Sequence, residues 1–300
     1  MGILILYFMR LILRSLLKII PDKYYLSVLY FRHFKRILHW RSPKAFSEKL
    51  QFLKIYDRRS EYTQMVDKYA VKEYVAQKIG EEYVIPTLNV WDKIEDIDWD
   101  NLPNQFVLKT THGGGSNGVI ICRDKSVFDR KFACESLQKA MFADIYIKYR
   151  EWPYKNVRKR IIAEEYIMNE NSQGISDLLD YKFFCFNGKP KYCQVISGRS
   201  ANMCIDFFDK AWQHQDFHEP HNYPFAEKLP QKPSNFNKMW ELATVLANGK
   251  PFVRIDFYNI NGKIYFGEIT FFPTSGFGGF DPIEWDYKFG SMIDLCLYQK

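Results

Sequence analysis

The segment from Phe252 to Thr270 constrains the fold most, because it sets charged side chains within two strongly apolar runs around an Asn-Gly dipeptide. The apolar residues predict a buried pair of strands joined by a hairpin turn, where charges need partners or a function. The register decides which charges meet. A two-residue Asn261-Gly262 turn would place Asp256 opposite Gly267 and would point Glu268 to the other face of the sheet.

A three-residue loop from Ile260 to Gly262 is the register that keeps the charges together. The glycine then takes the left-handed position of a bulge, and Glu268 lies opposite Arg254. With this loop, four polar side chains share one face of the strand pair: Arg254, Asp256, Glu268 and Thr270. Mg²⁺ prefers oxygen ligands and bridges carboxylates to nucleotide phosphates, so this face predicts a magnesium site.

A glycine-rich segment, Thr111 to Gly118, lies between two strand-like runs, Phe106–Thr110 and Val119–Cys122, and Lys109 ends the first of them. A Walker or a Rossmann loop would lead into a helix, and this loop does not. Glycines let consecutive backbone N–H groups turn toward an anion, and a lysine adds a point charge. The segment indicates a phosphate-binding loop, with an ordinary glycine hairpin as the alternative.

The rest of the chain mixes helices and strands without repeats or a flexible linker. Periodicity predicts short basic helices over 21–60 and a helix from Asp67 to Ile79 that ends at Gly80. It predicts further helices near 128–143 and 236–248, and strands at 87–91, 106–110, 119–122, 161–167, 181–186 and 190–196. This order predicts an α+β fold rather than a doubly wound sheet.

The basic charge of the chain belongs to its N-terminal part. Residues 1–60 contain thirteen Lys and Arg but only Asp22, Glu48 and Asp57, a local charge of +10. The whole chain has a net charge of +7, so the remaining 240 residues carry −3. A nucleic-acid binder would spread positive charge over its folded body, and we expect no nucleic-acid partner. An apolar content of 47% is sufficient for a real core.

The cysteines favour a reducing compartment. None of the six forms a C-x-x-C pair, and three lie in strand-like runs, which predicts buried free thiols. No cleavable signal follows the apolar start of the chain, since no small-residue cleavage site precedes Pro21. We therefore expect a cytoplasmic protein.

The first twenty residues predict an amphipathic helix on a membrane surface. Arg10, Arg14 and Lys18 are spaced by four, so they form a basic stripe on an otherwise apolar helix. Spanning a bilayer would bury three cations at about 2.5 to 3.5 kcal/mol each, whereas an interfacial helix keeps them among anionic headgroups. The alternatives are a helix packed on protein and a transmembrane anchor.

Six segments, in this order, resemble the ATP-grasp ligases, and are most similar to the teichuronopeptide-biosynthesis branch found with bacterial surface-polysaccharide genes. They are Asp67–Val75, Ile85-Pro86, Leu102–Gly115, Ile162–Ile167, Asp180–Lys189 and Val253–Asp256. No single segment is decisive, but the ordered set is specific. The likeness covers roughly residues 42 to 290.

The resemblance implies an ATP-grasp fold, in which ATP lies between two lobes with Mg²⁺. It implies that Lys68 and Lys109 bind the phosphates, and that the glycine loop forms a lid through Gly113, Gly114, Gly115 and Ser116. The segment containing Glu164, Glu165 and Ile167 would read adenine. Asp180 would belong to the nucleotide site, and Lys182 would reach the γ-phosphate. Asp256, Glu268 and Thr270 would bind magnesium, and Arg254 would face the acyl phosphate.

The implied organisation is a membrane-surface helix at 1–20, a basic helical extension at 21–60 and an ATP-grasp domain at 61–300. Within the domain, about 101–170 would form the nucleotide-lid lobe and about 175–300 the metal and catalytic lobe. The sequence departs from the family pattern where Thr270 replaces a metal-binding Asn. The short basic region also replaces a preceding Rossmann-like domain, which removes a common source of acceptor contacts.

The implied activity is an ATP-dependent carboxylate-amine ligase with an acyl-phosphate intermediate and ADP as product. It would join an amino acid to a sugar acid, an attached peptide or a lipid-linked polysaccharide acceptor, in capsule or teichuronopeptide synthesis at the inner face of the plasma membrane. A glycosyltransferase using the acidic loop Asp96–Asp100 is the main alternative, followed by an ATP-grasp kinase and a scaffold. A zinc site at His214, His218 and His221 is disfavoured by Pro220 and Pro224.

Overall fold

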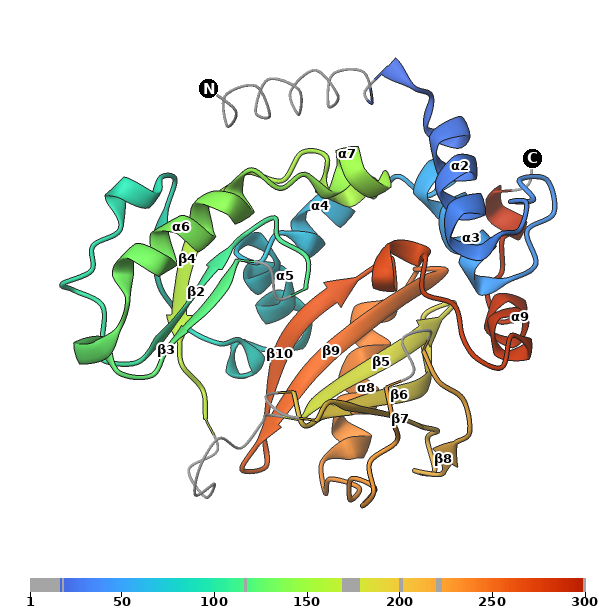
Figure 1. Ribbon diagram of the computed structural model, residues 1–300. Coiled ribbons are helices and arrows are strands. Elements are labelled where there is room, and N and C mark those ends of the chain that lie inside the picture. The colour runs from blue at the N-terminus through green and yellow to red at the C-terminus, as the bar shows by residue number, and fades with distance from the viewer. Residues whose placement is uncertain are drawn as a thin grey trace.

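The computed structural model describes residues 17, 19–115, 118–168, 179–199, 202–219 and 223–298. Figure 1 shows two β-sheets side by side, with helices on their outer faces and a helical N-terminal part at one end. The predicted helix at 1–20 lies almost wholly outside the described residues, as does Ser116. Among the described helices, none has both the length and the apolar character needed to cross a bilayer.

The smaller sheet has four antiparallel strands in the order β1-β4-β2-β3. These are β1 (Thr87–Trp91), β2 (Phe106–Thr110), β3 (Val119–Cys122) and β4 (Ile161–Glu165). Alternate residues of β2, Phe106 and Leu108, are buried under helix α6 (Arg130–Met141). Lys109 therefore points to the opposite face. The sheet includes β1, which precedes the predicted start of the lid lobe.

The larger sheet has six antiparallel strands in the order β10-β9-β5-β6-β7-β8. They are β5 (Asp180–Phe186), β6 (Lys189–Ser197), β7 (Cys204–Phe208), β8 (His214–Gln215), β9 (Phe252–Ile260) and β10 (Lys263–Thr270). Helix α8 (Phe236–Ala247) covers one face, where Phe183 contacts Phe236 and Trp240. The opposite face of β5 and β9 carries the charged residues and, beside them, Phe184, which packs against Phe280 and Phe289.

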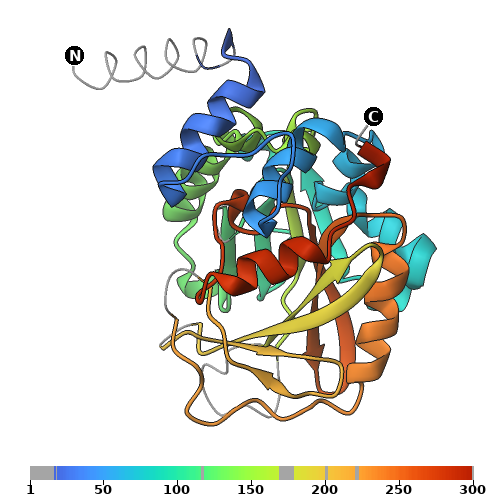
Figure 2. The ribbon, with the colours of Figure 1, turned by 90° about the vertical axis from the view of Figure 1, so that its right-hand side faces the viewer.

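Short helices connect the sheets and cover the N-terminal side. They are α2 (Asp22–Phe34), α3 (Phe46–Tyr56), α4 (Glu61–Val66), α5 (Ala70–Ile79), α7 (Ile145–Tyr149) and α9 (Glu284–Ser291). Single 3₁₀ turns lie at Glu81–Tyr83, Ile94–Asp96, Lys125–Val127, Trp152–Tyr154, Pro273–Gly276 and Cys296–Tyr298. Figure 2 shows α3 and α9 packed together beside the large sheet.

The hairpin of β9 and β10 corrects the predicted loop but confirms the shared face. Asn261 and Gly262, with φ of 52° and 80°, make a two-residue turn, so the predicted three-residue loop is wrong. Beyond the turn, Gly267 forms a bulge between Phe266 and Glu268. This extra residue shifts the strand pairing, so Glu268 points to the same face as Asp256. Glu268 consequently lies opposite Asp256, and Thr270 opposite Arg254.

Most predicted elements appear with ends displaced by a few residues. The predicted strand at 161–167 ends at Glu165, and the helix predicted from Asp67 begins at Ala70. All six cysteines are free, which confirms the prediction from their spacing. Cys122, Cys185 and Cys193 are buried in strands, and burial raises the pKa of each thiol.

Candidate functional site

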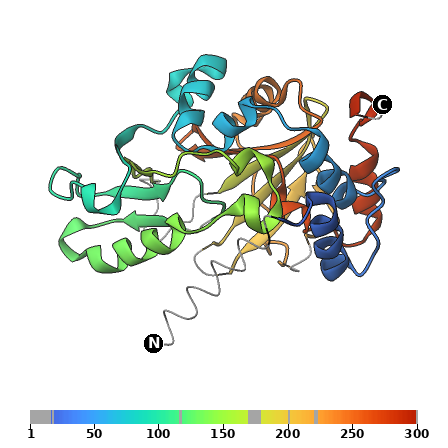
Figure 3. The same ribbon diagram turned by 90° about the horizontal axis from the view of Figure 1, so that it is seen from above.

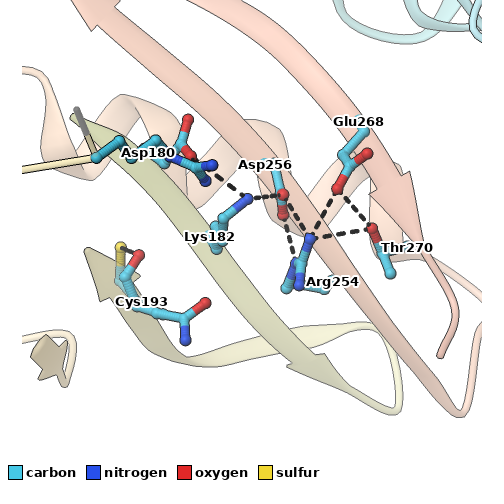
Figure 4. Close-up of polar contacts among 9 residues, drawn as sticks. Asp180, Lys182, Cys193, Arg254, Asp256, Glu268 and Thr270 are labelled. Carbon is cyan, nitrogen blue, oxygen red and sulfur yellow. Dashed lines mark hydrogen bonds and ion pairs between the residues drawn. The ribbon is translucent and has the colours of Figure 1, made fainter. Parts of the chain in front are cut away.

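The open face of the large sheet carries a cluster of four charged side chains. The Arg254 guanidinium donates to both carboxylate oxygens of Asp256 at 2.7 Å, and to Glu268 Oε1 at 2.8 Å. It also reaches the Thr270 hydroxyl at 3.2 Å, and Lys182 Nζ bonds to Asp256 Oδ2. Figure 4 shows these side chains pointing toward one another from β5, β9 and β10.

The strand register explains why these residues meet. Glu268, Asp256 and Lys182 lie directly opposite one another on β10, β9 and β5, and Gln194 on β6 continues the row. Opposed residues of neighbouring antiparallel strands point to the same face. Asp180, predicted for the nucleotide site, stands two residues before Lys182 and is paired with Arg199.

Burial and pairing set the ionisation of the cluster. Burial raises the pKa of Asp256, although Arg254 and Lys182 lower it in part. Burial would also raise the pKa of Glu268, but Arg254, Lys182 and Lys68 hold it well below its usual value. Burial would lower the pKa of Arg254, but Asp256 and Glu268 raise it instead. Two cations and two carboxylates therefore balance in the cluster.

One lysine from the small sheet and one from helix α5 pair with the buried carboxylate of Glu164 on β4. Lys72 Nζ lies 2.8 Å from Glu164, and Lys109 pairs with the other oxygen of the same carboxylate. Burial would raise the pKa of Glu164, but Lys109 and Lys72 lower it below its usual value. Lys72 stands one helical turn after Lys68, and sequence reasoning missed it although it lies within the segment quoted for the resemblance.

Lys68 links the glycine loop to the large sheet. Its ammonium bonds to the Gly113 carbonyl, and its backbone N–H donates to Thr111 O at 3.0 Å. Burial lowers the pKa of Lys68, while the charge of Glu268 opposes that change. The charges of Lys68, in the loop before α5, and of Glu268 on β10 therefore act on one another. Figure 3 shows the two sheets from above.

The other residues predicted for the nucleotide lie along the small sheet. Gly115 has φ of 61° and open space around it, whereas a Cβ on Gly114 would come within 3.1 Å of Ile145. Glu165 is exposed at the end of β4, and its backbone N–H donates to Pro86 O at 3.1 Å. Ile167 follows the strand and is half-buried. The Glu165 carbonyl and the Ile167 N–H remain predictions for adenine recognition.

Helix α3 supports the turn that follows β10. Lys54 Nζ donates to Ser275 O at 2.7 Å, and Gln51 donates to Gly276 O at 2.6 Å. Thr274 and Ser275 both have positive φ, of 49° and 54°, so this turn is strained and needs such support. Sequence reasoning missed this contact, because α3 and the turn lie more than 200 residues apart in the chain.

Comparison with known proteins identifies the family. The family model described as TupA-like ATP-grasp matches residues 48–294. The chain belongs to this TupA-like ATP-grasp family. No curated protein matches it. The family assignment rests on the sequence match. It confirms the resemblance to the ATP-grasp ligases and the predicted α+β ATP-grasp fold.

Solved ATP-grasp ligases are distant likenesses. D-alanine–D-alanine ligase from Bacillus anthracis is 19% identical, with a TM-score of 0.40, over 69% of this chain and 56% of that one. The corresponding ligase from Helicobacter pylori is 15% identical, with a TM-score of 0.40, over 85% and 71%. The ATP-grasp ligase PsnB is 10% identical, with a TM-score of 0.39, over 74% and 59%. The chain spans little more than half of the first of these proteins.

ATP-grasp membership implies magnesium, and the large sheet offers ligands that suit it. Asp256 and Glu268 present hard carboxylate oxygens from opposed positions, and Thr270 adds a hydroxyl on the same face. Within the described residues, no group of three or more His, Cys, Asp or Glu forms a metal cluster of protein ligands alone. This agrees with the chemistry of Mg²⁺, which uses one or two carboxylates plus phosphates and water.

The other candidate residues do not join this cluster. His214 bonds to the buried Asp206 at 2.9 Å, and His218 stacks on Phe225; His221 lies outside the described residues. Asp96, Asp98 and Asp100 are all exposed on the small-sheet side of the molecule, where Asp98 bonds to Asn101.

Proposed function

We propose that this protein is an ATP- and magnesium-dependent carboxylate-amine ligase. The observation that carries the proposal is the cluster in which Arg254 contacts Asp256, Glu268 and Thr270 while Lys182 contacts Asp256. Such a cluster presents cations and carboxylates together on one buried face, which suits a reaction in which negative charge moves between a phosphoryl group and an acyl group.

Each residue has a role in the proposed reaction. Lys68 and Lys109 bind the ATP phosphates, and Lys182 contacts the γ-phosphoryl group as it passes to the substrate carboxylate. The products of this step are an acyl phosphate and ADP. Attack by an amine then forms the amide and releases phosphate and a proton. Arg254 stabilises the negative charge that develops on the oxygen of the tetrahedral adduct.

Asp256 and Glu268 would hold magnesium, with Thr270 as a neutral neighbour. When bound, magnesium neutralises charge on the transferring phosphoryl group. Arg254 donates to both of these carboxylates, so the residues that would hold the metal are the same ones that hold the guanidinium beside the substrate position.

The substrates that we propose are a sugar acid, or a peptide or lipid-linked polysaccharide attached to one, and an amino acid. The support is the resemblance of the motifs to the teichuronopeptide branch, which acts in surface-polysaccharide and capsule synthesis. We also propose peripheral attachment to the inner face of the plasma membrane through residues 1–20. This attachment is supported by Arg10, Arg14 and Lys18, whose spacing of four residues predicts a basic stripe on a helix.

Product analysis tests the proposal. Purified protein is incubated with ATP, magnesium, a panel of uronic acids and mixed amino acids, and the products are identified by mass spectrometry. We expect ADP and a new mass equal to acid plus amine minus water. A stable phosphorylated acid formed without an amine would instead establish a kinase. Sugar transfer from a nucleotide sugar without ATP would overturn the ligase in favour of a glycosyltransferase at Asp96–Asp100.

A further inference from the structure

Helix α2 exposes an apolar stripe to solvent. Tyr24, Val28 and Phe31 are 72%, 60% and 54% exposed, and their spacing of four and three places them on one side of the helix. Ile19 and Ile20, directly before the helix, are also exposed. A contiguous group of large apolar side chains on the surface indicates an interaction site rather than scattered exposure.

The stripe is held on a fixed element of the protein. Leu26 and Tyr30, on the other side of α2, are fully buried. Tyr30 shares a hydrogen bond of 3.0 Å with Ser47 of α3, and Ser27 accepts one of 2.9 Å from Trp40. Figures 2 and 3 show α2 at the edge of the molecule, with the body of the protein on one side only. Among the described residues, Tyr24, Val28 and Phe31 on the opposite side remain exposed.

The acidic side chains of residues 17–60 all bond to other groups of the protein. Asp22 pairs with the buried Arg150 at 2.9 Å. Glu48 accepts from the His39 ring at 2.7 Å and also from three backbone N–H groups. Asp57 accepts from Tyr62 at 2.8 Å and pairs with Arg59. No carboxylate of residues 17–60 is left to offset positive charge at the surface.

Basic side chains follow the stripe along α2, and others are exposed in the next segment. Arg32 follows Val28 by one helical turn, and Lys35 is exposed at the end of α2. Arg41 and Lys44 are exposed in the segment that follows. None of these four forms an ion pair with another residue of the described ranges. The surface therefore combines large apolar side chains with unneutralised positive charge.

We infer that this face of α2 binds an anionic lipid bilayer. Apolar side chains enter the headgroup boundary while the cations meet lipid phosphates, as in an interfacial helix. A second copy of the chain would bring positive charge against positive charge, which disfavours self-association through this face. The inference extends the attachment proposed for residues 1–20 to the folded body, and it is independent of the ligase activity.

Vesicle binding by the full chain tests the inference. The triple variant Tyr24→Ser, Val28→Ser, Phe31→Ser is compared with the control Val127→Ser, Phe132→Ser. The control positions are 81% and 63% exposed and lie on the small-sheet side, at the other end of the molecule (Figure 1). Each protein is mixed with vesicles made of equal parts phosphatidylglycerol and phosphatidylcholine. We expect the triple variant to bind about tenfold more weakly and the control to bind as the intact chain does.

A second set of variants separates this face from residues 1–20. Arg10→Gln, Arg14→Gln and Lys18→Gln together test the first attachment, while the triple variant tests α2. If both sets of variants bind vesicles more weakly, residues 1–20 and α2 both contact the membrane. If only the α2 triple variant binds more weakly, α2 alone contacts it. If the triple variant binds as tightly as the intact chain, α2 is not a membrane contact. Two other results would overturn the membrane contact of α2. One is that the intact chain binds pure phosphatidylcholine vesicles as tightly as vesicles with phosphatidylglycerol. The other is that light scattering detects a dimer of the intact chain that the triple variant does not form.

Discussion

The six-stranded and four-stranded sheets both turn lysines and carboxylates toward the space between them, but they balance these charges differently. On the large sheet, Arg254 and Lys182 are matched by Asp256 and Glu268. Beside the small sheet, Lys109 of β2 and Lys72 of α5 share the single carboxylate of Glu164, and Lys68, in the loop before α5, adds a third cation bonded to a carbonyl. The small sheet therefore has excess positive charge, which a triphosphate would neutralise.

This difference separates two tasks. A surplus of cations favours the binding of an anion, whereas a balanced cluster favours a site whose charges are rearranged during a reaction. We expect substitutions on the small sheet to change nucleotide affinity, and substitutions on the large sheet to change turnover. The predictions below test that division and the stability of the loop beside the small sheet, beginning with the largest effect.

Replacing Glu268 with Gln should lower turnover by about a thousandfold, because a neutral amide no longer helps to hold magnesium on the transferring phosphoryl group. Glu268 lies at the edge of the cluster and its side chain is 33% exposed, so the fold should persist. Steady-state kinetics and a thermal melt measure the two effects. Glu241→Gln, exposed on α8, is the matched control. Full activity in Glu268→Gln would remove the large sheet from the reaction.

The small sheet should lose stability in mild acid through His112. Burial, together with Lys159, lowers the pKa of this histidine to about 4, and its Nδ1 has no partner among the described residues. Between its ordinary pKa of about 6.5 and this value, the unfolded chain takes up a proton that the folded chain does not. Unfolding free energy should fall by up to about 3 kcal/mol as pH drops through this range.

Denaturant unfolding at several pH values tests this contribution. His112→Gln should flatten the dependence between pH 6.5 and 4, since Gln can still donate to the Ala140 carbonyl that His112 contacts but takes up no proton. His33→Gln, which removes an exposed histidine of α2, is the comparison variant. An unchanged slope in His112→Gln would show that this buried histidine does not govern acid stability.

The smallest effect is expected for Lys109→Ala. Removing one of three cations should weaken ATP binding by about tenfold, or about 1.4 kcal/mol, because Lys68 and Lys72 remain. Titration calorimetry with ATP and magnesium measures it, and Lys139→Ala, exposed on α6, serves as the control. If Lys109→Ala binds ATP normally but turns over slowly, the division between the two sheets is wrong.

Local sequence patterns predicted most of the elements that build the candidate site. The strands Thr87–Trp91, Phe106–Thr110 and Val119–Cys122 have the bounds that periodicity gave. The shared face of Arg254, Asp256, Glu268 and Thr270 was also predicted, but from the wrong turn. A bulge at Gly267 also brings the four side chains to one face, but it sets Glu268 opposite Asp256 rather than Arg254. The Asn-Gly pair, which favours a two-residue turn, and the glycine inside the strand are the sequence signals for this arrangement.

The sequence by itself determined the strands, the apolar cores and the residue types available for phosphate and metal, because side-chain alternation and glycine positions act over a few residues. Only the tertiary structure decided which charges pair. Lys72 joins Glu164 across more than 90 residues, and Lys54 supports the turn at Ser275 across more than 200. These contacts depend on how α3, α5 and the two sheets pack, and that arrangement minimises exposed apolar surface over the whole chain rather than in any one segment.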